Sequence, residues 1–189
     1  MSQLASVGEQ EIKLAPRRVL IAGSGPDDVH GLAFRAKWAK EDYHSVTLDI
    51  DPRNEPDICA SMTNMGDIGK YDVVYCCHAL EHLYPHEVHQ TLSEFARVLV
   101  AGGTVFIMVP DLEGVSPTED ILNAPTMGPI TGLHLFYGDA TQIKQFPYMA
   151  HHCGFVQKTL EKVMKSVGLA DVSVRRAAEY NLIGTGVKV

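Results

Sequence analysis

The sequence of 189 residues has no apolar run that approaches the eighteen or so residues of a membrane span. Residues 1–16 lack the basic and then apolar profile of a signal peptide, so we expect a cytoplasmic protein without membrane association. Positive charge is scarce, because 16 lysines and arginines face 23 acidic residues and the net charge is −7. This balance disfavours a nucleic-acid partner and favours a small molecule or another protein as substrate.

The cysteines lack the spacing of a metal or redox site. No C-x-x-C pair occurs, so neither a structural zinc nor a thioredoxin-type dithiol is indicated. Cys76 and Cys77 are adjacent in an expected strand and should point to opposite faces, which disfavours a disulfide framework. We expect all four cysteines to be reduced core residues: Cys59, Cys76, Cys77 and Cys153.

The first half of the chain alternates strands with helices. The whole chain has 46% apolar and 21% charged residues, which predicts one ordered domain over 17–189. We expect a polar and partly disordered lead-in over 1–16 before it. Short connections between the elements predict a parallel sheet with helices on both faces. Strands are expected at 19–23, 46–50, 57–60, 71–77 and 104–110, and helices at 29–42 and 85–100, the second ended by Ala101-Gly102-Gly103.

The alternation stops after Asp111. Residues 112–153 are rich in glycine, proline and aromatic residues without a sustained period, and we expect an irregular lid over the carboxyl edge of the sheet. A helix over 155–167 follows, and then two strands, 171–177 and 181–189. Their short separation predicts an antiparallel hairpin.

Two stretches near the N-terminus have the pattern of a nucleoside-binding crevice. RVLIAGSGPDD (18–28) combines a buried strand with a glycine turn, and SVTLDIDP (45–52) is a second strand that ends in an acid. Gly23 and Gly25 allow the turn to lie against a ligand, and Asp49 would accept hydrogen bonds from ribose hydroxyls. A glycine turn that binds nothing remains an alternative, because this motif alone is weak.

The charges beside the glycines indicate which nucleoside fits. The third glycine of G-x-G-x-x-G is missing, because position 28 is Asp. Asp27 and Asp28 would cap the following helix and repel a phosphate placed beside it. This disfavours NAD and FAD and favours a nucleoside without phosphates, such as S-adenosylmethionine (SAM).

Histidines lie where such a sheet places its ligands. His78, Glu81 and His82 follow the strand 71–77 at the expected carboxyl edge. The lid adds further polar and aromatic candidates, namely His134, Tyr137, Tyr148, His151 and His152. We take His78 and His151 as candidate general bases. For His82 a loop-anchoring role is favoured over catalysis.

Several motifs in order carry a resemblance to a known family. VLIAGSGP, LDIDP, YDVVYCCHALEHL, and RVLVAGG followed by TVFIMVPDL resemble the class I SAM-dependent methyltransferases from Arg17 to the C-terminus. GPITGLHLFYG and YMAHHCGF are similar to segments of small bacterial methyltransferase-like proteins. The resemblance implies an α/β, Rossmann-like three-layer sandwich with a seven-stranded, mostly parallel sheet and an antiparallel last strand.

The resemblance also implies a set of cofactor-binding residues. Ala22, Gly23 and Gly25 would line the methionine moiety, and Asp49 would hold the ribose with Ile50 beside the adenine. The remaining expected contacts are Ser61 and Met62 at the adenine, and Cys77 and His78 near the sulfonium. The chain departs from the family pattern at Ile21, Asp27 and Ser61.

A metal site is the less favoured interpretation of the same residues. H-A-L-E-H (78–82) matches the H-x-x-E-H signature of a zinc peptidase, but that motif needs a helix where this chain leaves a strand. Certain methyltransferases surround a divalent ion with E-x-x-E-H and a later histidine, which would correspond here to Glu81, His82 and His151 with His78 in place of the first Glu. We expect no metal.

Together these observations predict a SAM-dependent methyltransferase that acts on an oxygen or nitrogen of a small-molecule or saccharide acceptor. The alternative is a catalytically degenerate, methyltransferase-like accessory or regulatory protein, which the three departures from the pattern favour. NAD-linked oxidoreduction is disfavoured by the acidic helix start, and a homodimer is left open.

Overall fold

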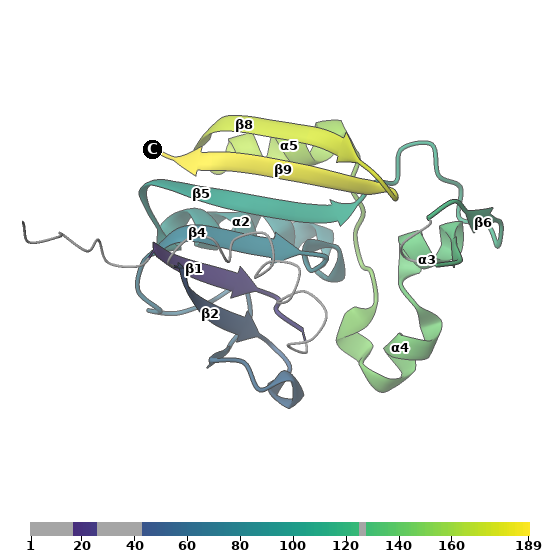
Figure 1. Cartoon of the computed structure of the whole chain (residues 1–189), viewed down its shortest axis with the longest axis horizontal. Helices are drawn as coiled ribbons and strands as arrows, with labels where there is room; N and C mark the ends of the chain where they lie inside the picture. Colours follow the sequence, from purple (N-terminus) through teal and green to yellow (C-terminus); the bar gives the residue numbers. More distant parts are fainter. Residues whose placement is uncertain (1–16, 26–42, 125–127) are drawn as a thin grey trace, which may run out of the picture.

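The computed structural model describes residues 17–25, 43–124 and 128–189. Its main feature is a seven-stranded sheet with the strand order β3-β2-β1-β4-β5-β9-β8 (Figure 1). The strands are β1 (Arg17–Ala22), β2 (Tyr43–Asp49), β3 (Ile58–Cys59), β4 (Tyr71–Cys77), β5 (Leu99–Pro110), β8 (Leu169–Ala177) and β9 (Asn181–Lys188). The helix expected over 29–42 falls outside the described residues.

The strand directions confirm the predicted fold class. β1 to β5 pair in parallel, whereas β9 is antiparallel to both of its neighbours, β5 and β8. The last strand in the sequence is therefore inserted between β5 and β8, as expected for the Rossmann-like sheet. Because β1 lies between β2 and β4, the strand order reverses at β1, which is where open α/β sheets bind their ligands.

Two helices cover one face of the sheet: α2 (Pro85–Val98) and α5 (Gln157–Ser166). Their buried residues form one hydrophobic cluster with Cys76. Cys77 belongs to a second cluster on the opposite face, together with Val19, Tyr75 and Phe106. The predicted opposite orientation of the two cysteines is confirmed, and all four cysteines are free thiols. The expectation that all four lie in the core was wrong for Cys59, which is exposed, and Cys153 is only partly buried.

The expected end of α2 was wrong. The helix ends at Val98, and β5 begins at Leu99, so Ala101, Gly102 and Gly103 lie within the strand. Leu99 is buried and pairs with Tyr71, so burial draws the chain into the sheet before the glycines are reached. Gly102, with a φ of +76°, instead accompanies a shift in the β4–β5 register.

The segment 112–153, here called the lid segment, lies beyond the carboxyl ends of the parallel strands (Figure 1). It contains a two-stranded sheet, β6 (Ile121–Leu122) with β7 (Ile130–Thr131), then α3 (Gly132–Tyr137), α4 (Ala140–Gln145) and the 3-10 helix η3 (Pro147–Met149). The other 3-10 helices are η1 (Pro52–Asn54) and η2 (Leu80–His82). In the described part of the chain no helix has the length and apolar character to cross a membrane.

We expect Leu92→Ala to lower the free energy of unfolding by about 2 to 5 kcal/mol, because Leu92 is fully buried between α2 and the sheet and its loss leaves a cavity. Denaturant unfolding followed by circular dichroism measures the change. Leu133→Ala is the matched control, since Leu133 is 36% exposed and should lose less than about 1 kcal/mol. Equal losses in both variants would contradict this assignment of the core.

Candidate functional site

The turn after β1 is shaped by its first glycine. The backbone N–H groups of Gly23 and Ser24 both donate to the carbonyl oxygen of Leu48, at 2.8 and 3.1 Å. Gly23 has a φ of +66°, and a Cβ at this position would overlap with the Cβ of Ala79. Only glycine therefore allows the turn to approach the end of β4 this closely. Ala22, just before it, is fully buried.

Asp49 holds this turn from the end of β2. Its Oδ2 accepts a hydrogen bond from the Gly25 N–H at 2.8 Å, and its Oδ1 accepts one from the Asp51 N–H at 2.8 Å. The residue is buried. A carboxylate has about four lone-pair positions, so these two bonds leave capacity for further donors. The structure gives Asp49 a structural role that the sequence did not reveal, and its contact with a ribose stays a prediction.

The three residues expected around the adenine differ in their exposure and in their contacts with this turn. Ile50 directly follows Asp49 and is 46% exposed, as an apolar surface for a ligand requires. The Met62 sulfur lies 3.6 Å from the position that a Gly23 Cβ would take, so Met62 is a neighbour of the glycine turn. Ser61 uses its hydroxyl within its own turn, 2.8 Å from the Thr63 hydroxyl.

The end of β4 presents Cys77 and His78. Cys77 is buried, and this burial raises the pKa of its thiol to about 11, so it remains protonated near neutral pH. His78 has a φ of +50°, a conformation that costs free energy in a residue with a side chain. Its N–H donates to the Met108 carbonyl oxygen at 2.8 Å, which fixes the strained residue at the edge of β5.

Beside His78 a cavity of about 130 Å³ lies between the strand ends and the lid segment. The structure brings His78, Glu81 and His82 together there with His134 and His151, which are far away in the sequence. The other expected lid residues lie elsewhere: Tyr137 and Tyr148 are more than half exposed, and His152 stacks on Tyr84 with 4.3 Å between ring centroids.

The electrostatics of the cavity centre on Glu81, which is 1% exposed. His78 Nδ1 lies 3.3 Å from Glu81 Oε1, the distance of an ion pair. Burial alone would raise the pKa of the Glu81 carboxyl, but the nearby His78 and His82 imidazoles hold it below its usual value. Burial also lowers the pKa of His151, although the Glu81 carboxylate acts in the opposite direction. The carboxylate is therefore ionised at neutral pH while His151 is neutral.

Glu179 and Asn181 are among the cavity residues that sequence reasoning missed. Glu179 lies in the β8–β9 turn, where Glu179 and Tyr180 have φ values of 59° and 58°, and Asn181 begins β9. The signal was available, because a strand that runs antiparallel to β5 must begin at the carboxyl edge of the parallel strands. The predicted hairpin therefore already placed its own turn beside the site.

Comparison with known protein families shows which family the chain belongs to. A family model described as a methyltransferase domain matches residues 6–174. The chain belongs to this methyltransferase family. The resemblance to class I SAM-dependent methyltransferases is thereby confirmed at the level of family and fold. No sequence among the curated proteins matches the chain.

Solved structures support the same fold. A SAM-dependent methyltransferase from Archaeoglobus fulgidus matches with a TM-score of 0.64 and 16% identity, over 92% of this chain and 86% of that one. A putative O-methyltransferase from Nostoc punctiforme matches with a TM-score of 0.63 and 14% identity, over 93% of this chain and 53% of that one. The 1,6-didemethyltoxoflavin-N1-methyltransferase from Burkholderia thailandensis, solved with bound 1,6-didemethyltoxoflavin and S-adenosylhomocysteine, matches with a TM-score of 0.59 and 14% identity, over 92% of this chain and 72% of that one.

The chain is shorter than many of these structures. It spans 51% of an O-methyltransferase family protein from Burkholderia thailandensis, for example. At identities this low the similarity establishes the fold and leaves the acceptor open.

We expect Gly23→Ala to destabilise the protein more than Gly25→Ala. Both glycines have positive φ, which costs an alanine roughly 1 kcal/mol, but only at Gly23 does the new Cβ overlap a neighbour, adding about 1 to 3 kcal/mol. Gly25, with nothing within 4 Å of an added Cβ, is the matched control. Guanidinium unfolding measures both variants, and equal losses would show that the approach to Ala79 is not tight.

Proposed function

We propose that the protein transfers the methyl group of SAM to an oxygen or nitrogen of a small-molecule or saccharide acceptor. The observation that carries the proposal is the arrangement at the β1–β4 switch point. There the glycine turn held by Asp49 touches Ala79, one residue after His78, which lines the cavity. A nucleoside on the turn and an acceptor in the cavity would lie on either side of the end of β4.

The cofactor side rests on the residues expected from the sequence. Ala22, Gly23 and Gly25 would contact the methionine moiety, and the remaining lone pairs of Asp49 would accept hydrogen bonds from the ribose. Exposed Ile50 and neighbouring Met62 supply apolar surface for the adenine. Cys77, as a buried neutral thiol, and His78 close the end near the sulfonium.

The chemistry is an in-line displacement at the methyl carbon. An acceptor oxygen or nitrogen attacks this carbon, the bond from carbon to sulfur breaks, and its electron pair returns to sulfur to give neutral S-adenosylhomocysteine. Sulfur is already a good leaving group, so alignment of the reactants is the main requirement. The proton of the acceptor passes to a base, for which His78 and His151 are the candidates because both line the cavity.

A second function has specific support: a methyltransferase-like accessory protein that binds SAM weakly or not at all. Both Asp49 oxygens already accept backbone hydrogen bonds, and the Ser61 hydroxyl is used within its own turn. A ligand would therefore find fewer free polar groups here than in a site where positions 49 and 61 both carry an acid without other hydrogen bonds.

Calorimetry with S-adenosylhomocysteine separates the two functions. We expect micromolar binding to the wild-type protein and binding about ten- to hundredfold weaker in Asp49→Asn, because the variant loses charge-assisted hydrogen bonds to the ribose. Asp72→Asn is the control, since Asp72 also accepts a 2.8 Å backbone hydrogen bond, from Arg18, but lies at the start of β4, the end of the strand away from the expected site. No heat at millimolar ligand would reject the enzymatic proposal and leave the accessory one.

The role of a general base is tested on turnover. We expect His78→Asn to lower kcat by about 10² to 10⁴-fold, since Asn tolerates the positive φ of this position but accepts no proton. Release of S-adenosylhomocysteine with a panel of hydroxyl and amine acceptors is the measurement, and exposed His89→Asn is the control. Unchanged turnover in both His78→Asn and His151→Ala would reject the base.

A further inference from the structure

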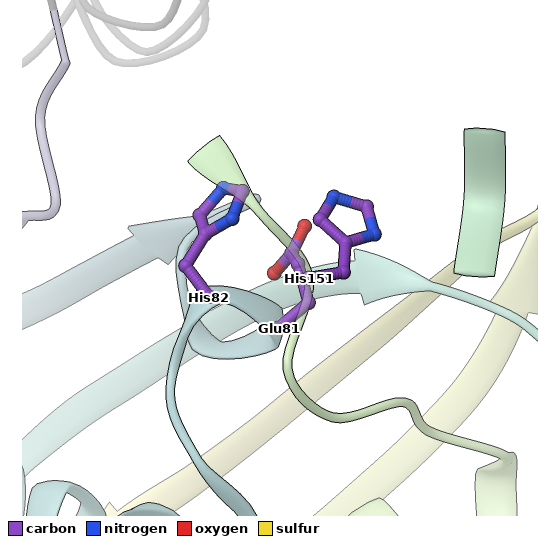
Figure 2. Close-up of side chains that lie close together, drawn as sticks. All are labelled: Glu81, His82 and His151. Carbon is purple, nitrogen blue, oxygen red and sulfur yellow. The ribbon is translucent and has the colours of Figure 1, made fainter. Parts of the chain in front are cut away.

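Three potential metal ligands meet at the cavity. Glu81 and His82 come from η2 after β4, and His151 comes from the lid segment after η3. One ligand atom from each residue lies within 4.8 Å of the other two. Figure 2 shows the two imidazole rings on either side of the Glu81 carboxylate.

Backbone carbonyl groups fix the tautomers of both histidines. His82 Nδ1 lies 3.2 Å from the Ala150 carbonyl oxygen, and His151 Nδ1 lies 2.9 Å from that of Leu135. Because a carbonyl oxygen only accepts hydrogen bonds, each Nδ1 must carry the proton and donate it. When such a ring is neutral, as a metal ligand must be, its lone pair is on Nε2. Metal-bound histidines are oriented in this way, with the second ring nitrogen donating to a carbonyl or carboxylate.

The Glu81 carboxylate needs a positive partner. It is 1% exposed, and neither oxygen has a hydrogen-bond partner in the described part of the chain. Leaving such a charge without bonds is costly, so a buried carboxylate of this kind calls for a cation. His78 approaches from one side, with its Nδ1 3.3 Å from Oε1, and the His82 and His151 rings lie on either side of the carboxylate (Figure 2).

Backbone hydrogen bonds hold the three residues in register. The N–H groups of His152 and Cys153 donate to the backbone carbonyl oxygen of Glu81, at 2.8 and 3.2 Å. These bonds join the lid segment to η2 directly beside the ligand atoms. Donor atoms in a tetrahedral zinc site are roughly 3.3 Å apart, so small side-chain rotations would close the set around an ion.

We propose that Glu81, His82 and His151 bind a divalent transition-metal ion, for which zinc is the best match to two imidazoles and one carboxylate. This departs from the expectation drawn from the sequence, which was that no metal binds. Three protein ligands leave a coordination position open to a water or to an acceptor oxygen in the cavity. The ion would lower the pKa of that oxygen, and His78, outside the ligand set, would remain the candidate base.

The test is a zinc titration of the full-length protein, stripped with a chelator and then competed against a chromogenic zinc indicator. We expect one zinc per chain, with affinity at least about a hundredfold weaker in Glu81→Gln, His82→Ala and His151→Ala, because each removes a ligand. His89→Ala is the histidine control, and Cys153→Ser excludes a thiol ligand. No zinc binding by the wild type, or equal affinity in all variants, would overturn the proposal.

Two further measurements distinguish the loss of a metal ligand from misfolding of a variant. Near-ultraviolet circular dichroism shows whether each variant is folded, and zinc should raise the thermal unfolding midpoint of the wild type but not of the three ligand variants. A midpoint that zinc leaves unchanged in the wild type would also count against the site. The readout is independent of methyl transfer: zinc binding without binding of S-adenosylhomocysteine would reject the proposed function and leave the metal site standing.

Discussion

The backbone carbonyl of Glu81 accepts two hydrogen bonds from the lid segment, at His152 and Cys153, and this junction connects the two halves of the site. One half is the end of β4, which carries His78, and the other is the lid segment, which carries His151. Without the junction the cavity would lose one wall, and the buried Glu81 side chain would lose the surroundings that keep water away from it. The shape of the cavity therefore depends on this backbone contact.

The cofactor edge is organised by a different carboxylate. Asp49 receives the amides of Gly25 and Asp51, so the acid that is expected to meet the ribose also holds the glycine turn in place. Substituting it would disturb the turn as well as the ligand contact, so a distant acid with its own backbone hydrogen bond is the appropriate comparison. The overlap that an alanine at position 23 would make with Ala79 shows how closely the two strand ends approach.

Most of the sheet could be predicted from the sequence, because buried strands and amphipathic helices have local signatures. The strand 71–77 was predicted with its observed bounds, and the antiparallel pairing of the last two strands was also correct. The end of α2 was not, since the burial of Leu99 outweighed the local preference of the glycines that follow. The cavity residues Glu179 and Asn181 were missed, because a hairpin turn has no local feature that marks it as part of a site.

The sequence by itself determined the family, the fold and the candidates His78 and His151, because glycine turns, strand-end acids and apolar periods are properties of short segments. Only the tertiary structure decided that His151 meets Glu81 and His82, which are about seventy positions away along the chain. It also decided which nitrogen of each ring carries the proton, through carbonyl groups of distant residues. Contacts of this kind depend on how the lid segment folds back over the sheet, and no local pattern encodes that.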